Sequence, residues 1–400
     1  MALVVDQSPL SIPTKSPGIV AFTRRIPALD GLRGIAILGV LAYHYSNGGS
    51  QSSNAAVRAL SSAFGLGWAG VDLFFVLSGF LITGILFDTM MDPGYYRKFY
   101  ARRALRIFPI YYLTAAVIFV VGASLGVHWR AGHLSFLFFC GFPAALLWPS
   151  LIQLPQFIHF THVWSLSVEE QFYAAWPWLI RRMGCRRNIL FTCLGMFVAA
   201  VFLRIAFVAL ASPSWANLFL PCRMDSLAVG AALAIATRTW KASFMSRWAP
   251  LVFALSSVSL LLLCWVRGTE DRSDAGIAIW GPSLIALSCG ALLVMSLGPL
   301  SRLFSLSVLR LFGRYSYGIY LYHFPLEALL EPLKPRIMAH IRSFAVGSVA
   351  YVVACVAIDV SIAALSFHFI ESPIMRWKSS FRYSKIPDMT TDSAMVPSGY

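Results

Sequence analysis

The stretch IPALDGLRGIAILGVLAYHY, residues 26–45, decides the fold of this chain. It has the length of about 20 residues that an α-helix needs to cross the hydrocarbon core of a bilayer. It nevertheless contains Asp30, Arg33 and His44. At about 3.6 residues per turn, the step from Arg33 to His44 is close to three full turns, and Asp30 lies one turn before Arg33. We therefore predict a membrane-spanning helix with a polar stripe on one face.

The polar stripe indicates a site inside the membrane. With a rise of about 1.5 Å per residue, His44 lies roughly 16 Å from Arg33 along the helix axis, about half the thickness of the core. Polar side chains at this depth are costly and usually line a cavity or a pathway. The alternative is that His44 only hydrogen-bonds a neighbouring helix. The arginine on the same face favours a functional site.

The composition of the chain predicts a polytopic membrane protein. Of its 400 residues 58% are hydrophobic, and the mean hydropathy is +0.70. Such values exclude an ordinary soluble domain. The net charge of +15 would suggest nucleic acid for a soluble protein. Here the preference of basic residues for cytoplasmic loops, together with anionic lipid, explains most of it, and we expect no nucleic-acid partner.

The hydropathy pattern predicts an all-α fold with about ten transmembrane helices. The basic loops between the helices favour a topology with both termini in the cytoplasm. The predicted spans lie near residues 26–45, 66–87, 107–126, 164–180, 189–211, 217–237, 249–266, 277–297, 315–333 and 344–369.

Three further regions are assigned from composition. A proline-containing segment near 134–160 is predicted to be re-entrant or interfacial, because a full crossing there would put an arginine-rich loop outside. Residues 1–25 are expected to form a cytoplasmic tail, 26–377 the membrane domain, and 378–400 a disordered cytoplasmic tail. Seven cysteines occur singly, so neither a disulfide framework nor a thiolate metal site is predicted.

A pair of arginines precedes the third span. Arg103 and Arg106 stand three residues apart on a predicted helix, so both guanidinium groups can face one ligand. Arginine forks suit phosphate groups. The alternative is a cytoplasmic anchor of the kind that basic residues commonly provide beside a span.

Two other spans carry polar residues. The sequence THVWSLSVEEQFYAAWP, residues 161–177, brings Glu169 into the membrane, where a carboxylate can accept hydrogen bonds from a histidine or a polar substrate. The span at 66–87 contains Asp72 near its outer end. It also contains Ser78 beside a glycine, which permits close approach of a ligand or of another helix.

The run GRYSYGIYLYHFPL, residues 313–326, contains Tyr322 and His323. Tyrosines in a membrane helix commonly belong to the interfacial belt or to packing, and that alternative stays open here. His323 and Glu327 are four residues apart, so we expect that they can form a buried pair.

Taken together, these motifs resemble the acyltransferase-3 family of integral membrane O-acyltransferases. Arg33 and His44 match the family pattern of an arginine and a histidine separated by ten residues. The resemblance covers residues 26–377, and its motifs, in order, are LDGLRG, GVDLFFVLSGFLIT, FYARRALRIFPIYY, HVWSLSVEEQFY, RMDSLAVG and GRYSYGIYLYHFPL.

The resemblance implies roles for individual residues. His44 would be the catalytic residue and Arg33 its partner. Glu169 would belong to the catalytic residues as well. Arg103 and Arg106 would contact the phosphates of acyl-CoA, and no metal is expected. Substrate or pocket positions, assigned with less detail, would be Asp30, Asp72, Ser78, Tyr322 and His323. Family members fused to an esterase-like C-terminal domain exist, and this chain is expected to be the stand-alone form.

These observations predict an enzyme of the bacterial plasma membrane that moves an acyl group, acetyl by family analogy, from cytoplasmic acyl-CoA to a hydroxyl of a cell-surface or exported glycan. A hydroxyl needs a general base at neutral pH, which histidine can supply. A covalent acyl-histidine is the competing route. From another class, a transporter or flippase for a polar glycan intermediate would also need buried charges, but would consume no acyl-CoA.

Overall fold

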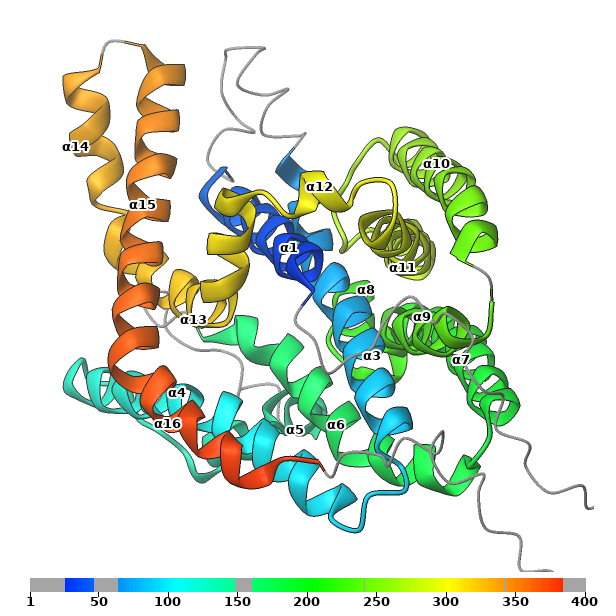
Figure 1. Ribbon diagram of the computed structural model, residues 1–400. Helices are drawn as coiled ribbons and strands as arrows, with labels where there is room; N and C mark the ends of the chain where they lie inside the picture. Colours follow the sequence, from blue (N-terminus) through cyan, green and yellow to red (C-terminus); the bar gives the residue numbers. More distant parts are fainter. Residues whose placement is uncertain (1–25, 47–63, 148–159, 241, 342, 384–400) are drawn as a thin grey trace, which may run out of the picture.

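The structure, a computed structural model, describes residues 26–46, 64–147, 160–240, 242–341 and 343–383 (Figure 1). Every regular element in these ranges is helical, which confirms the all-α class. The long helices are α1 (Pro27–Ser46), α3 (Gly70–Asp88), α4 (Tyr95–Ser124), α6 (Trp164–Met183), α7 (Arg186–Leu210), α9 (Leu220–Thr239), α10 (Ala242–Arg267), α11 (Ala275–Leu297), α13 (Ser307–Leu330) and α15 (Phe344–Ser366).

Short helical elements connect or extend the long ones. They are η2 (Leu66–Ala69), η3 (Ala131–Phe138), α5 (Gly141–Leu147), η5 (Thr161–Val163), α8 (Pro213–Ala216), α12 (Ser301–Phe304), α14 (Leu333–His340), η6 (Phe367–Glu371), α16 (Ser372–Arg376) and η7 (Trp377–Phe381). Each of the ten predicted spans therefore corresponds to one long helix.

Seven helical stretches of the described chain are long and apolar enough to cross a membrane, so the protein is a polytopic membrane protein. The other three predicted spans are α1, α6 and α13, which are 20, 20 and 24 residues long. Their length suffices for a crossing. They are less apolar because they carry the charged and polar side chains that the sequence singled out.

The centre of the molecule is built on α1, which packs against α13 and α3. Figure 1 shows α14 and α15 on one side of this centre and α7, α9, α10 and α11 on the other. A Cβ added at Gly34 would overlap the carbonyl oxygen of Leu309, and one added at Gly313 would overlap that of Asp30. Small residues thus let the backbones of α1 and α13 touch, as is common between membrane helices.

The described part of the segment near 134–160 contains η3 and α5, which are too short to cross a bilayer. The η3 end is fixed to the bundle, because Tyr111 Oη donates to the Phe136 carbonyl at 2.6 Å and Gln171 Nε2 to the Phe139 carbonyl at 2.9 Å. This agrees with a re-entrant or interfacial segment. Residues 148–159 lie outside the described ranges.

The predicted tails lie largely outside the described residues, which begin at 26 and end at 383. Helix η7 continues beyond the predicted start of the C-terminal tail at 378. Arg102 donates to the carbonyl oxygens of Lys378 and Phe381, both at 3.3 Å, and this attaches η7 to α4.

Candidate active site

Two cavities meet in the centre of the bundle. The first, of about 90 Å³, we call the arginine cavity. Its polar lining comes from five helices or their ends and includes Arg33, Ser78, Arg103, Arg106, Ser165, Glu169, Tyr173, Ser316, Tyr317 and Tyr320. The second, of about 290 Å³, we call the histidine cavity, and it is lined by Val40, Tyr43, His44, Trp68, Val71, Thr161, His162, Trp164, Leu218, Arg272, Tyr320 and Phe324.

The cavities share two lining residues, Val71 on α3 and Tyr320 on α13. The Tyr320 hydroxyl donates to the His162 carbonyl at 3.0 Å and lies 2.6 Å from Ser165 Oγ. It is therefore held in place between the cavities. The stripe on α1 leads from Arg33 in one cavity to His44 in the other, so one helix supplies a polar group to each.

The arginine cavity combines three guanidinium groups with a hydrogen-bonded carboxylate. Glu169 Oε1 accepts from Ser78 Oγ at 2.6 Å, and Glu169 Oε2 accepts from the Tyr173 hydroxyl at 3.1 Å. Arg103 lies over the Tyr173 ring, with 5.6 Å between the guanidinium carbon and the ring centroid. These contacts form one wall of the cavity.

The charge of the arginine cavity is positive. Arg33 forms an ion pair with Asp30 at 3.5 Å, one turn earlier on α1. Within the described ranges, neither Arg103 nor Arg106 has a carboxylate oxygen within ion-pair distance. Their guanidinium groups can therefore take up an anion, and phosphate fits their fork geometry best.

In the histidine cavity, His44 lies beside a carboxylate. Its Nδ1 atom is 3.5 Å from Oε2 of Glu327, which comes from α13. The ring centroids of His44 and His323 are 4.9 Å apart, and those of His323 and His162 are 5.3 Å apart. Three histidines from α1, η5 and α13 thus gather around one point.

The pairing of Glu327 differs from the expected pair with His323. His323 Nδ1 lies 2.7 Å from the Tyr320 carbonyl oxygen on its own helix, while the Glu327 carboxylate faces His44. A spacing of four residues permits contact within a helix. Here the neighbouring helix provides the partner, because α1 and α13 pack closely.

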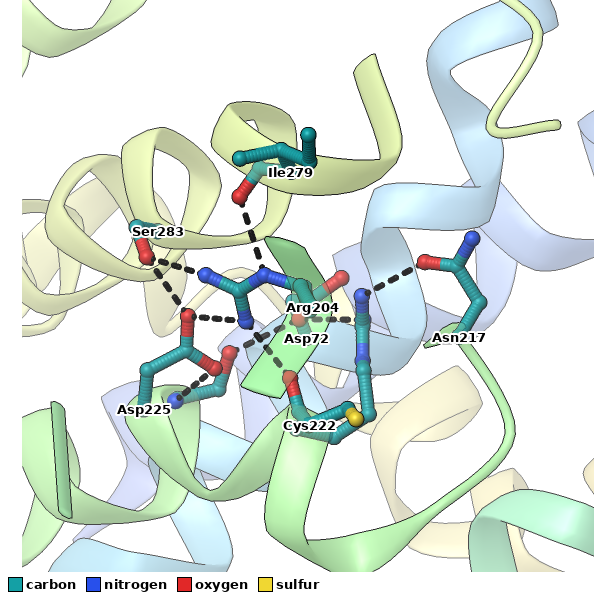
Figure 2. A network of polar contacts seen from close by, with 9 residues as sticks. Asp72, Arg204, Asn217, Cys222, Asp225, Ile279 and Ser283 are labelled. Atoms are coloured by element: carbon teal, nitrogen blue, oxygen red, sulfur yellow. Dashed lines mark hydrogen bonds and ion pairs between the residues drawn. The ribbon is translucent and has the colours of Figure 1, made fainter. Parts of the chain in front are cut away.

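Four predicted pocket residues line neither cavity: Asp30, Asp72, Tyr322 and His323. The contacts of Asp30 and His323 are given above, and those of Asp72 and Tyr322 follow. Asp72 is fully buried and accepts from Arg223 Nη2 at 2.5 Å and from Ser226 Oγ at 2.7 Å (Figure 2). The Tyr322 hydroxyl lies 2.7 Å from Ser366 Oγ on α15. The structure thus gives both residues contacts between helices.

A buried charge network continues from Asp72 through α7, α9 and α11. Figure 2 shows Arg204 surrounded by oxygen atoms: Asp225 Oδ2 at 2.8 Å, Ser283 Oγ at 2.6 Å and the Ile279 carbonyl at 2.9 Å. The Arg204 and Asp225 side chains have no exposed surface. Because the donors of Arg204 are used by these partners, this network joins helices and offers no ligand site.

The sequence did not single out Arg272, and it did not place His162 or Glu327 beside His44. His162 begins the motif HVWSLSVEEQFY, and Glu327 follows GRYSYGIYLYHFPL. Both were therefore visible as polar residues beside family motifs. Their proximity to His44 depends on how separate helices pack, which spacing within one helix does not reveal.

Comparisons with known proteins identify the family to which the chain is similar. A family model of the acyltransferase-3 type, described as an acyltransferase domain, matches residues 26–362. The peptidoglycan O-acetyltransferase OatA of Listeria monocytogenes is 29% identical over 384 residues, 88% of this chain and 56% of the relative. "Putative peptidoglycan O-acetyltransferase YrhL" of Bacillus subtilis is 30% identical over 388 residues, 88% of this chain and 55% of the relative.

A further relative, from Staphylococcus aureus, is named "Putative O-acetyltransferase SAR0937" and is 26% identical over 393 residues, 90% of this chain and 60% of the relative. The chain thus spans between half and two thirds of the length of these relatives. No solved structure is significantly similar to it. Because the family model matches most of the chain, this protein belongs to the acyltransferase-3 family.

Proposed function

We propose that this protein is an O-acyltransferase that moves an acyl group, in the first place acetyl, from acyl-CoA to a hydroxyl of a glycan. The observation that carries the proposal is that two cavities, one lined by His44 and the other by three arginines, have Val71 and Tyr320 in common in their walls. A phosphate-bearing donor requires cations, and a hydroxyl acceptor requires a base. The names of the relatives, which describe peptidoglycan O-acetyltransferases, support acetyl and a cell-wall glycan as first choices.

The donor is assigned to the arginine cavity. The phosphates of acyl-CoA would be bound by Arg103 and Arg106, with Arg33 deeper along the same cavity. The pantetheine arm would then extend toward Tyr320 and bring the thioester to the border of the histidine cavity. Glu169 would hold Ser78 and Tyr173 in the cavity wall and offset part of the arginine charge.

The acceptor is assigned to the histidine cavity, with His44 as general base. The acceptor oxygen attacks the thioester carbonyl while His44 takes its proton. The carbon–oxygen ester bond forms, the carbon–sulfur bond breaks, and the proton passes to the CoA thiolate. Glu327 beside Nδ1 would favour the tautomer with the proton on Nδ1, which leaves Nε2 as the base.

In the covalent route His44 itself attacks the thioester, so that a carbon–nitrogen bond forms, the carbon–sulfur bond breaks and CoA thiolate leaves. The acceptor oxygen then attacks the acyl-histidine, the ester bond forms, the carbon–nitrogen bond breaks and the hydroxyl proton is released. The two routes are separated by incubating the protein with labelled acetyl-CoA and no acceptor. An acetyl group on His44 in mass spectra of the rapidly quenched protein would favour the covalent route.

For the orientation, we propose that both termini face the cytoplasm and that the membrane is the bacterial plasma membrane. The arginine cavity would then open toward cytoplasmic acyl-CoA, because Arg33 is nearer than His44 to the N-terminal end of α1. The acceptor would be reached from the opposite side or from within the membrane.

The test is mass spectrometry of ester-linked acyl groups on glycans from cells that carry the wild-type protein, the His44→Ala variant or no copy. We expect an acyl ester only with the wild type. A His44→Ala variant that is expressed, folded and fully active would refute the assignment of the base. Glu331→Gln, which changes an exposed carboxylate at the end of α13, is the control for nonspecific effects.

The transporter alternative is tested with the purified protein. An acyltransferase releases free CoA when acetyl-CoA and acceptor are both present, whereas a transporter for a glycan intermediate does not. Movement of the glycan without release of CoA would therefore replace the proposal by the alternative.

A further inference from the structure

Arg272 is a cation at the wall of the histidine cavity to which the proposed reaction assigns no role. It lies in the connection between α10 and α11, outside both helices. It lines the cavity together with His44 and the aromatic residues Tyr43, Trp68 and Trp164. Its guanidinium carbon is 5.9 Å from the centroid of the Trp164 ring. A cation and several aromatic faces therefore surround the space beside His44.

The acidic residues of the same connection are directed elsewhere. Asp274 is paired with Arg267 at 2.7 Å, and Asp271 Oδ1 accepts from the Ser273 backbone N–H at 2.8 Å. The Glu270 carboxylate lies against Gly65. Among the described residues, no carboxylate forms an ion pair with Arg272.

The backbone beside Arg272 is fixed to the cavity at two carbonyl groups. Trp68 Nε1 donates to the Glu270 carbonyl at 3.4 Å, and Asn217 Nδ2 donates to the Arg272 carbonyl at 2.9 Å. Asn217 is itself 2% exposed. The connection is thus anchored by one residue that lines the cavity and by one buried amide.

Asn217 joins this connection to the buried charge network. Its Oδ1 atom accepts from Arg223 Nη1 at 3.4 Å, and Arg223 is the partner of Asp72 (Figure 2). Arg223 also lies 5.8 Å from the centroid of Trp164, the ring that Arg272 approaches. The network therefore positions both Arg272 and the aromatic wall beside it.

We propose that the histidine cavity selects an acceptor sugar that carries an oxyanion, either a carboxylate or a phosphate, and that Arg272 binds this group. The aromatic residues would pack against the apolar face of the sugar ring and place its hydroxyl near His44. A guanidinium that forms no ion pair with any carboxylate of the described residues, and that lines the same cavity as His44, favours an anionic over a neutral acceptor. The inference rests on the proposed function only for the role of the bound sugar as acceptor.

The test measures binding, so it does not depend on turnover. The full-length protein in detergent micelles is titrated with N-acetylglucosamine, N-acetylmuramic acid and N-acetylglucosamine 1-phosphate, and Kd is determined by calorimetry. These sugars share one ring; the first is neutral, the second carries a carboxylate on the lactyl group at O3, and the third carries a phosphate at C1. The variants are Arg272→Gln and, as a matched control on the same connection, Arg267→Gln, whose side chain is paired with Asp274 and does not line the cavity.

We expect the wild type and Arg267→Gln to bind at least one anionic sugar more tightly than the neutral one, by roughly tenfold. In Arg272→Gln the anionic and neutral sugars should bind equally. The better of the two anionic sugars shows which anion, at its position on the ring, Arg272 recognises. Equal binding of all three sugars by the wild type, or an unchanged preference in Arg272→Gln, would overturn the inference.

Failure of the inferred anion site and failure of the proposed acyl transfer give different results. A preference for anionic sugars that depends on Arg272, without CoA release from acetyl-CoA, would uphold the site and refute acyl transfer. CoA release together with equal binding of neutral and anionic sugars would support acyl transfer and refute the anion site at Arg272.

Discussion

At the scale of single residues, the proposed chemistry depends on the pair of His44 and Glu327. The Nδ1 atom of His44 and Oε2 of Glu327 are 3.5 Å apart, and both side chains are partly exposed, by 19% and 23%. A carboxylate at this position can orient the imidazole and stabilise the imidazolium that forms when the base accepts a proton.

The first prediction concerns Glu327→Gln, which keeps the shape of the side chain and removes its charge. We expect kcat for acetyl transfer to fall by about 100-fold, because the imidazolium loses its counter-charge. The rate of CoA release in the presence of acetyl-CoA and acceptor measures this kcat. Glu331→Gln should retain wild-type kcat, and equal rates for the two variants would contradict a role for Glu327.

The second prediction concerns Arg103 and Arg106. Each change to Gln should raise KM for acetyl-CoA by roughly tenfold while kcat changes little, because the phosphates are remote from the thioester. The matched control is Arg97→Gln, an exposed arginine on the same helix, which should leave KM unchanged. If KM of the Arg103 and Arg106 variants equals that of the control, these arginines only anchor α4 at the membrane surface.

Residue spacing predicted which side chains of α1 would share a face, because that depends only on helix geometry. It did not predict that Glu327 would face His44, or that Arg272 would line the same cavity. Those contacts bring together α1, α13 and the α10–α11 connection, which are far apart in sequence. Asp72 shows the same limit, since its partner Arg223 comes from α9.

At the scale of elements, the close packing of α1 on α13 holds the site together. The third prediction is that Gly34→Ala destabilises the protein by about 1–3 kcal/mol and lowers activity, because the new methyl group must displace the Leu309 backbone. Thermal unfolding and CoA release measure the two effects. Gly195→Ala, at a glycine inside α7 with open space around it, should lower neither stability nor activity, and similar losses in both variants would argue against a packing effect specific to α1 and α13.

The fourth prediction contrasts a buried and an exposed ion pair. Asp72→Asn leaves the Arg223 charge buried without its counter-ion and should destabilise the protein by about 3 kcal/mol or more. Asp274→Asn breaks the exposed pair with Arg267 but preserves a side chain that can cap α11, so little change is expected. Unfolding temperatures in one detergent compare the variants, and a loss for Asp274→Asn as large as that for Asp72→Asn would contradict this explanation.

Hydropathy located the long helices well, because a span must be apolar over most of its length. The exceptions are informative. Helices α1, α6 and α13 are less apolar than the other spans, and they carry Arg33, Glu169 and His323 into the protein interior. The arrangement of helices around α1 could not be predicted, since many pairings bury the same apolar area.

At the scale of the whole molecule, the two cavities lie toward opposite ends of the stripe on α1 and meet at Val71 and Tyr320. Such an arrangement lets donor and acceptor bind in separate places and react where the cavities join. The two cavities also differ in character, because one has a cationic lining and the other an aromatic one. The account therefore predicts transfer between substrates supplied on opposite sides of the membrane.

The measurement that tests this most directly uses vesicles with the purified protein in their membrane. The vesicles enclose the acceptor that mass spectrometry of ester-linked acyl groups identifies. Acetyl-CoA labelled in its acetyl group is added outside. We predict that labelled ester forms on the enclosed acceptor and that free CoA appears outside, with neither product in vesicles carrying His44→Ala. Folded wild-type protein that leaves the enclosed acceptor unlabelled, or His44→Ala that labels it equally, would contradict the account.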